Sequence, residues 1–187
     1  EDNVAPTAIC QNITVQLDAN GNATITPADV DGGSNDACGI ASTNIDITTF
    51  DCSNVGANNV VLTVTDNNGN VSTCTAVVTV EDNVAPTAIC QNITVQLDAN
   101  GNATITPADV DGGSNDACGI ASTSIDINTF DCSNVGANNV VLTVTDNNGN
   151  VSTCTAVVTV EDNVAPTAIC QNITVQLDVN GNATITP

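Results

Sequence analysis

Residues 60–80 read VVLTVTDNNGNVSTCTAVVTV, and this stretch decides the fold class. Val60, Leu62 and Val64 fall on one face of an extended chain and Thr63 and Thr65 on the other, which is the period-two pattern of a strand with one buried face. Asp66–Asn70 contains only turn-forming residues, and the alternation resumes from Cys74. The stretch therefore predicts two long antiparallel strands joined by a tight turn.

Shorter alternating segments surround this pair. They lie at residues 13–17, 23–25 and 45–47, and residues 18–22 between the first two have the composition of a hairpin turn. We find no segment with a 3.6-residue apolar period and helix caps. Short strands separated by polar turns predict an all-β fold, an antiparallel β-sandwich.

The whole pattern returns every 80 residues. Residues 1–80 and 81–160 form two copies that differ only at Asn44/Ser124 and Thr48/Asn128, and residues 161–187 begin a third. Self-similarity at a fixed period is the mark of a tandem array, here one expected to belong to a longer chain. The first strand leads away from the proximal end, where the chain joins the preceding repeat, and the last strand leaves at the opposite, distal end. We therefore expect an extended rod, with the 18–22 turn distal and the 29–39 and 66–70 segments proximal.

Composition restricts the partners. The chain has 21 acidic residues and no Lys, Arg or His, so its net charge is −21. Nucleic acid and anionic membranes are excluded as partners, because phosphate binding needs cationic side chains. We expect no membrane insertion in this segment, since it has no apolar run of spanning length.

Each full repeat carries four cysteines, and a ninth, Cys170, belongs to the partial copy. An even number per repeat in a chain without His favours disulfides over zinc, and hence an oxidising, extracellular compartment. We favour pairing the first cysteine of a repeat with the last and joining the middle two. The alternative joins neighbours in sequence, Cys10–Cys38 and Cys52–Cys74. The favoured pairs are Cys10–Cys74 and Cys38–Cys52, with Cys90–Cys154 and Cys118–Cys132 in the second copy.

Acidic and amide residues gather in the segments expected at the proximal end. Calcium takes six to eight oxygen ligands, so such a cluster is suited to this cofactor. The alternative is that Asp, Asn and Gly here only form turns, with solvated side chains. The candidate ligands are Glu81, Asp82, Asn83, Asp109, Asp111, Asp116, Asp146 and Asn148, with equivalents Glu1, Asp2, Asp29, Asp31, Asp36 and Asp66 in the first repeat.

Three segments carry a resemblance to a known family. Residues 35–40 (NDACGI), 50–56 (FDCSNVG) and 64–70 (VTDNNGN) resemble the hyalin-repeat (HYR-like) domain. The resemblance implies an extracellular immunoglobulin-like module. The variant with these cysteine motifs is similar to tandem arrays in giant surface proteins of Bacteroidota, including gliding-motility adhesins. It implies adhesion or display and provides no ligand-binding or catalytic residues.

The sequence predicts no enzyme. Serines have no His or Lys to act as base, and the Asp pairs have no aromatic sugar platform beside them. The leading hypothesis is a structural stalk of a secreted cell-surface adhesin, whose partners are the neighbouring repeats of the same chain. The alternative is a repeat that itself binds surface glycans, or that assembles with other copies into a filament through divalent cations.

Overall fold

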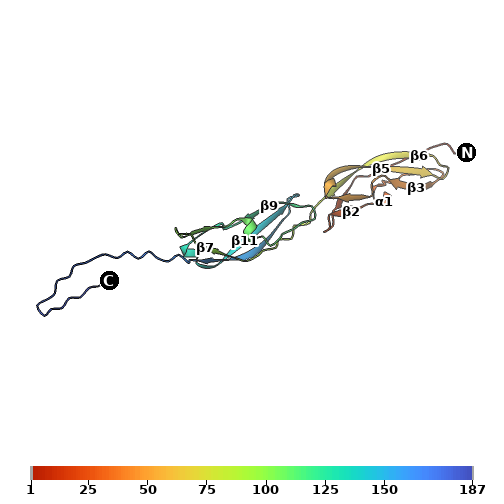
Figure 1. Cartoon of the computed structure of the whole chain (residues 1–187). Helices are drawn as coiled ribbons and strands as arrows, with labels where there is room; N and C mark the ends of the chain where they lie inside the picture. The colour runs from red at the N-terminus through yellow and green to blue at the C-terminus, as the bar shows by residue number, and fades with distance from the viewer. Residues whose placement is uncertain (1, 187) are drawn as a thin grey trace.

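The computed structural model of the chain describes residues 2–186. It consists of two β-sandwich domains placed one after the other along an extended molecule, followed by a single strand-free segment (Figure 1). The first domain has a four-stranded sheet in the order β1-β6-β5-β3 and a two-stranded sheet, β2-β4. Its elements are β1 (Ile13–Gln16), β2 (Asn22–Thr24), α1 (Pro27–Val30), β3 (Ile40–Ile45), β4 (Thr49–Asp51), η1 (Cys52–Asn54), β5 (Gly56–Asp66) and β6 (Val71–Glu81).

The second domain repeats this topology. Its sheets have the orders β7-β12-β11-β9 and β10-β8. The elements are β7 (Ile93–Gln96), β8 (Asn102–Thr104), α2 (Pro107–Val110), β9 (Ile120–Ile125), β10 (Thr129–Asp131), η2 (Cys132–Asn134), β11 (Gly136–Asp146) and β12 (Val151–Glu161). The predicted all-β sandwich fold is therefore confirmed for both domains.

The long hairpin β5–β6 supplies most of each core. Alternate residues on these two strands point between the sheets, and Val60, Leu62 and Val64 are 0% exposed. They pack with Leu17 and Phe50, which come from outside the hairpin. Burying one Val, Leu or Phe side chain contributes about 1.5–3 kcal/mol to the stability of the fold. Phe50 is the one aromatic residue of this core.

The turn at residues 18–22 differs from the prediction. It closes as expected, with Asp18 N donating to Asn22 O at 2.8 Å. However, β1 pairs with β6 and β2 pairs with β4, so the turn carries the chain from one sheet to the other and is not a hairpin. The β1–β6 pairing is parallel, which makes the strand that enters the domain and the strand that leaves it direct neighbours.

The expected bond between the first and last cysteines of each full repeat is present. Cys10–Cys74 joins the start of the domain to β6 with a Cα–Cα distance of 5.8 Å, and Cys90–Cys154 does the same in the second domain. Each closes a loop with a sequence separation of 64 residues, for which loop entropy gives about 4 kcal/mol of stabilisation.

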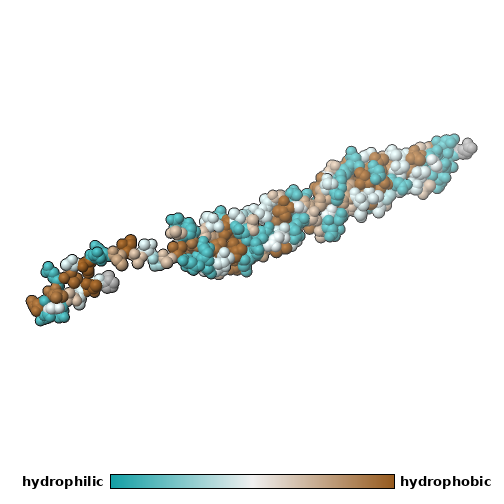
Figure 2. Space-filling view, viewed as in Figure 1, coloured by the Kyte–Doolittle hydropathy of each residue, from teal (hydrophilic) through white to brown (hydrophobic). Residues whose placement is uncertain are grey.

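Residues 162–186 carry the third copy of the sequence but none of its strands. Their apolar side chains face solvent, as the brown surface of this segment in Figure 2 shows, and Ile169 is 90% exposed. Over residues 2–186, the helices are too short to cross a bilayer.

Candidate functional site: the junction between the domains

The two domains meet through a small set of loops. The distal end of the first domain presents the 18–22 turn, η1 and the end of β6. The proximal end of the second presents the linker 82–86, the loop before β9 and the turn between β11 and β12. Because the sequence repeats, this junction shows how any two complete copies can meet.

A disulfide crosses the junction. Cys52, at the start of η1, is bonded to Cys118 of the second domain, with a Cα–Cα distance of 5.2 Å. Asp116 Oδ1 accepts a hydrogen bond from Cys118 N at 2.7 Å, and Asn147 Nδ2 donates to Cys118 O at 2.7 Å. The loop that carries Cys118 is therefore held in place from both sides. We call the Cys52–Cys118 bond the junction strap.

The predicted Cys38–Cys52 and Cys118–Cys132 bonds are wrong. Within one domain the two middle cysteines lie at opposite ends, because β3 runs between them along the domain axis. A six-residue strand spans ~20 Å at ~3.3 Å per residue, whereas bridged Cα atoms lie within about 7 Å. The alternative pairing is wrong as well, since Cys10 is bonded to Cys74.

The sequence contained a signal for the strap. The expected placement of residues 29–39 at the proximal end puts Cys38 there, and an end-to-end array brings that end against the distal end of the neighbouring copy. Both pairings predicted from the sequence join cysteines of one copy, whereas the strap joins cysteines of two copies. Within residues 2–186, Cys38, Cys132 and Cys170 are in no disulfide.

The linker is fixed by one amide side chain of the second domain. Asn150 Nδ2 donates to Asp82 O at 3.0 Å and to Val84 O at 3.3 Å, and also to Asp146 Oδ2 at 2.8 Å. Desolvation opposes ionisation of Asp146, but hydrogen bonds from Asn150 and from backbone amides outweigh it and hold the Asp146 pKa below its ordinary value. The buried carboxylate thus keeps Asn150 aimed at the linker.

Asp82 and Asp116 form an acidic pair beside the strap. Their carboxylate oxygens and Cys118 Sγ lie within 4.8 Å of one another. Asp82 is only 6% exposed, and its Oδ1 accepts from Val84 N at 3.0 Å. Its Oδ2 is buried and has no hydrogen-bond partner within residues 2–186. Cys118 Sγ is part of the strap and is therefore not available as a thiolate ligand.

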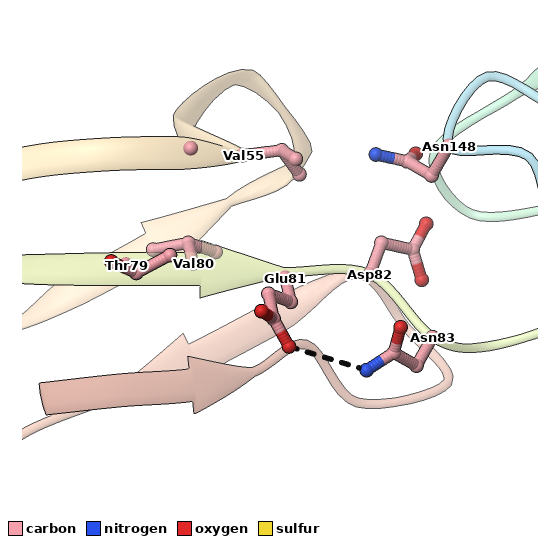
Figure 3. Close-up of a pocket in the computed structure, with 8 residues that line it drawn as sticks. Val55, Thr79, Val80, Glu81, Asp82, Asn83 and Asn148 are labelled. Carbon is pink, nitrogen blue, oxygen red and sulfur yellow. Dashed lines mark hydrogen bonds between the residues drawn. The ribbon is translucent and has the colours of Figure 1, made fainter.

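A hollow opens next to this pair. Figure 3 shows Glu81 at the end of β6 and Asp82 and Asn83 in the linker beyond it, with Asn148 of the second domain facing Val55 of the first. The hollow has a volume of about 370 Å³. Gln16 binds two of the lining residues: its Nε2 donates to Glu81 Oε2 at 2.6 Å, and its Oε1 accepts from Asn83 Nδ2 at 2.5 Å. Side-chain amides thus donate hydrogen bonds to the Glu81 carboxylate, but they do not compensate its negative charge.

The other predicted ligands are used to shape the backbone. Asp109 accepts from Thr106 N at 2.6 Å and caps α2, and Asp111 accepts from Ser114 N at 2.8 Å in the following loop. Hydrogen bonding from Thr106 and Ser114 lowers the pKa of these two carboxyls below the ordinary value. Of the eight candidates, the structure places Glu81, Asp82, Asn83 and Asn148 around the hollow and Asp116 beside Asp82.

The first repeat holds the equivalent cluster at its proximal end. Asp2, Asp36 and Cys38 have ligand atoms within 4.8 Å of one another, and Cys38 is exposed. Hydrogen bonding to Asp2 and the negative charge of Asp2 raise the pKa of the Cys38 thiol above its ordinary value. The thiol therefore stays protonated at neutral pH and is a weak nucleophile.

Comparison with known proteins gives structural similarity only. No protein-family model and no curated protein sequence matches the chain. Protocadherin gamma B7 extracellular cadherin domains 1–4 give a TM-score of 0.39 at 11% identity. The match covers 84% of this chain and 51% of the protocadherin chain.

Two further solved structures are similar at the same level. Human protocadherin-24 EC1-2 gives a TM-score of 0.43 at 12% identity, covering 86% of this chain and 100% of that one. Fibronectin(III)-like modules of Clostridium thermocellum CbhA give 0.32 at 11% identity, covering 90% and 99%. All three TM-scores are below 0.5.

Proposed function

We propose that the chain is a stalk segment of an extracellular surface adhesin, built from hyalin-repeat-like domains that hold an adhesive region away from the cell. The observation that carries the proposal is the junction strap. It joins the bodies of consecutive domains at a point separate from the linker, so the two domains are connected twice. A double connection restricts bending and twisting, which suits a spacer more than a flexible tether.

The chemistry of the chain supports the same conclusion. Three disulfides within residues 2–186 suit an oxidising environment outside the cytosol. The net charge of −21 makes chains repel one another, which favours separated, soluble rods at low salt. The domains are placed end to end (Figure 1), so each added copy increases length and not width.

Small-angle X-ray scattering tests the stalk proposal. We expect the wild-type chain to scatter as an extended particle with one narrow distribution of inter-domain angles. The double variant Cys52→Ser/Cys118→Ser should show a broader distribution and a shorter mean length, while Cys132→Ser, at the equivalent position of the second domain, should match the wild type. A compact wild-type particle would contradict the proposal, and specific binding in a glycan array would favour the ligand-binding alternative.

A second candidate function is binding of a divalent cation at the junction, and the unpartnered Asp82 Oδ2 favours it. An uncompensated buried charge is costly, so a cation beside it would be stabilising. Asp82, Asp116 and the Asn148 amide offer oxygen atoms, which calcium prefers. The hollow of about 370 Å³ also has room for waters, at ~30 Å³ each, to complete the coordination.

Calorimetric titration with calcium tests this second function. The variant Asp82→Asn should lose one binding event that the wild type shows. Asp162→Asn is the matched control. Asp162 follows β12 as Asp82 follows β6, but it is exposed, so this variant should keep the calcium-binding event. Equal heats for the wild type and Asp82→Asn would rule out calcium binding at this site. Calcium-dependent light scattering would instead indicate assembly of several chains.

A further inference from the structure

The strands that enter and leave each domain lie side by side. β1 pairs in parallel with β6, in a register that places Ile13 beside Val78 and Gln16 beside Glu81. A pull on the two ends of the rod would therefore load β1 and β6 in opposite directions. Tension applied to the ends of the chain therefore acts first on the hydrogen bonds between β1 and β6, before it reaches the rest of the domain core.

A disulfide joins the chain just before β1, where the pulling force enters the domain, to β6. Cys10 lies three residues before β1 and is bonded to Cys74 within β6, and Cys90–Cys154 repeats the arrangement. Tension that arrives at Cys10 therefore passes through the sulfur atoms to Cys74 and leaves along β6. Residues 11–73 lie inside the closed loop, and the load does not pass through them.

The covalent path that remains is short. From Cys74 the chain reaches Cys90 in 16 residues and then crosses to Cys154 through the next disulfide. This path consists of the rest of β6 and of residues 82–89, which contain no helix or turn. A strand already rises by ~3.3 Å per residue, and a fully extended chain reaches at most ~3.6 Å. The β6 part of the path, residues 75–81, can therefore lengthen by only ~2 Å, and residues 82–89 have no helix or turn to unwind.

We infer that the array is a tension-bearing cable, in which disulfides carry the load past the folded body of every repeat so that pulling does not unfold it. This inference rests on the proposed stalk function and adds to it a resistance to tension. The junction strap has a different role: it joins the two domain bodies directly and restrains bending between them, whereas the 16-residue path is the short covalent link between the two axial disulfides.

Single-molecule pulling on both ends of the full chain tests the inference. The variant Cys52→Ser/Cys118→Ser is used because Cys52 lies inside the Cys10–Cys74 loop, so an intact strap would change the length that reduction of this bond releases. Without reductant, we expect the chain to stiffen with no stepwise lengthening from either domain. With dithiothreitol, a thiolate attacks one sulfur, the other cysteine leaves as a thiolate, and the second dithiothreitol thiol completes the reduction.

Each reduction should release one closed loop as a discrete step. The loop has a sequence separation of 64 residues, so the step in contour length should be roughly 210–230 Å at ~3.3–3.6 Å per residue. Two such steps per molecule, seen only with dithiothreitol, would support the inference. Steps of this size without reductant would overturn it, and so would an absence of steps with reductant. Scattering reports shape without load, so failure here leaves the stalk proposal separately testable.

Discussion

The two junctions of the chain have the same sequence and different structures. At the first, Asp82 is 6% exposed, Asn150 holds the linker, and Cys52 is bonded to Cys118. At the second, Asp162 is exposed, and Cys132 is in no disulfide within residues 2–186. What differs is the folded domain that follows the first junction. The comparison shows that this junction is made by two domain surfaces and not by the linker sequence.

The segments beyond the two junctions extend the comparison. Residues 87–106 and 167–186 differ only at Ala99 and Val179, yet the first contains β7 and β8 and the second has no strand. The turn survives in both, with Asp178 N donating to Asn182 O at 2.8 Å. Turn chemistry is therefore local, whereas β7 forms because β12 lies beside it.

The largest expected effect comes from completing the third repeat. In a chain lengthened by a copy of residues 108–160 after Pro187, the segment 167–186 gains its partner strand and should fold. Hydrogen exchange of its amides should slow by about 10³-fold or more, as expected for a stable domain. Cys132 should then bond to the added cysteine that corresponds to Cys118. Peptide mapping that finds Cys132 still as a thiol would contradict this prediction.

A smaller effect is expected from a matched pair of glycine substitutions. Gly21 and Gly101 occupy equivalent turns with φ of +74° and +79°, so Ala should cost about 1 kcal/mol of unfolding free energy at either position. A Cβ on Gly21 would lie 2.6 Å from Cys52 Sγ, which is fixed by the strap, and 3.3 Å from Ala117 Cβ. At Gly101 the neighbour is Cys132 Sγ at 2.7 Å.

The two variants should therefore differ at the junction. Cys132 is not bonded and can rotate away, so Gly101→Ala should keep the strap intact. Gly21→Ala should form less of it, and more free thiol at Cys52 should appear on alkylation and mass spectrometry. Denaturant titration measures the shared loss of stability. If both variants form the strap completely, the distal turn does not constrain it.

The smallest effect is a pH dependence centred on Asp146. The pKa of Asp146 is lower in the folded domain than in the unfolded chain. Ionised Asp146 therefore stabilises the fold above the unfolded pKa of about 3.9. This stabilisation is lost as the pH falls through the folded pKa. The unfolding free energy should be flat between about pH 7 and 5 and decline below about pH 4. The Asp146→Asn variant should be less stable than the wild type at pH 7, with a gap that narrows in acid. A gap that stays constant with pH would contradict the prediction.

The sequence alone determined the repeat and the all-β sandwich, and it favoured the bond from first to last cysteine that the structure contains. The reason is that alternating apolar residues and turn formers act over short distances, and the β5–β6 hairpin follows from residues 60–80 alone. It also determined the direction of travel through each repeat, from proximal to distal end.

The tertiary structure decided what meets at the junction. Only the folded domains show that β3 separates Cys38 from Cys52, that Cys118 faces Cys52, and that Asp109 and Asp111 hold backbone amides instead of joining Asp82. These pairings join residues far apart in sequence, and in the strap they join different copies. Such contacts depend on the three-dimensional path of whole strands, which local patterns do not specify.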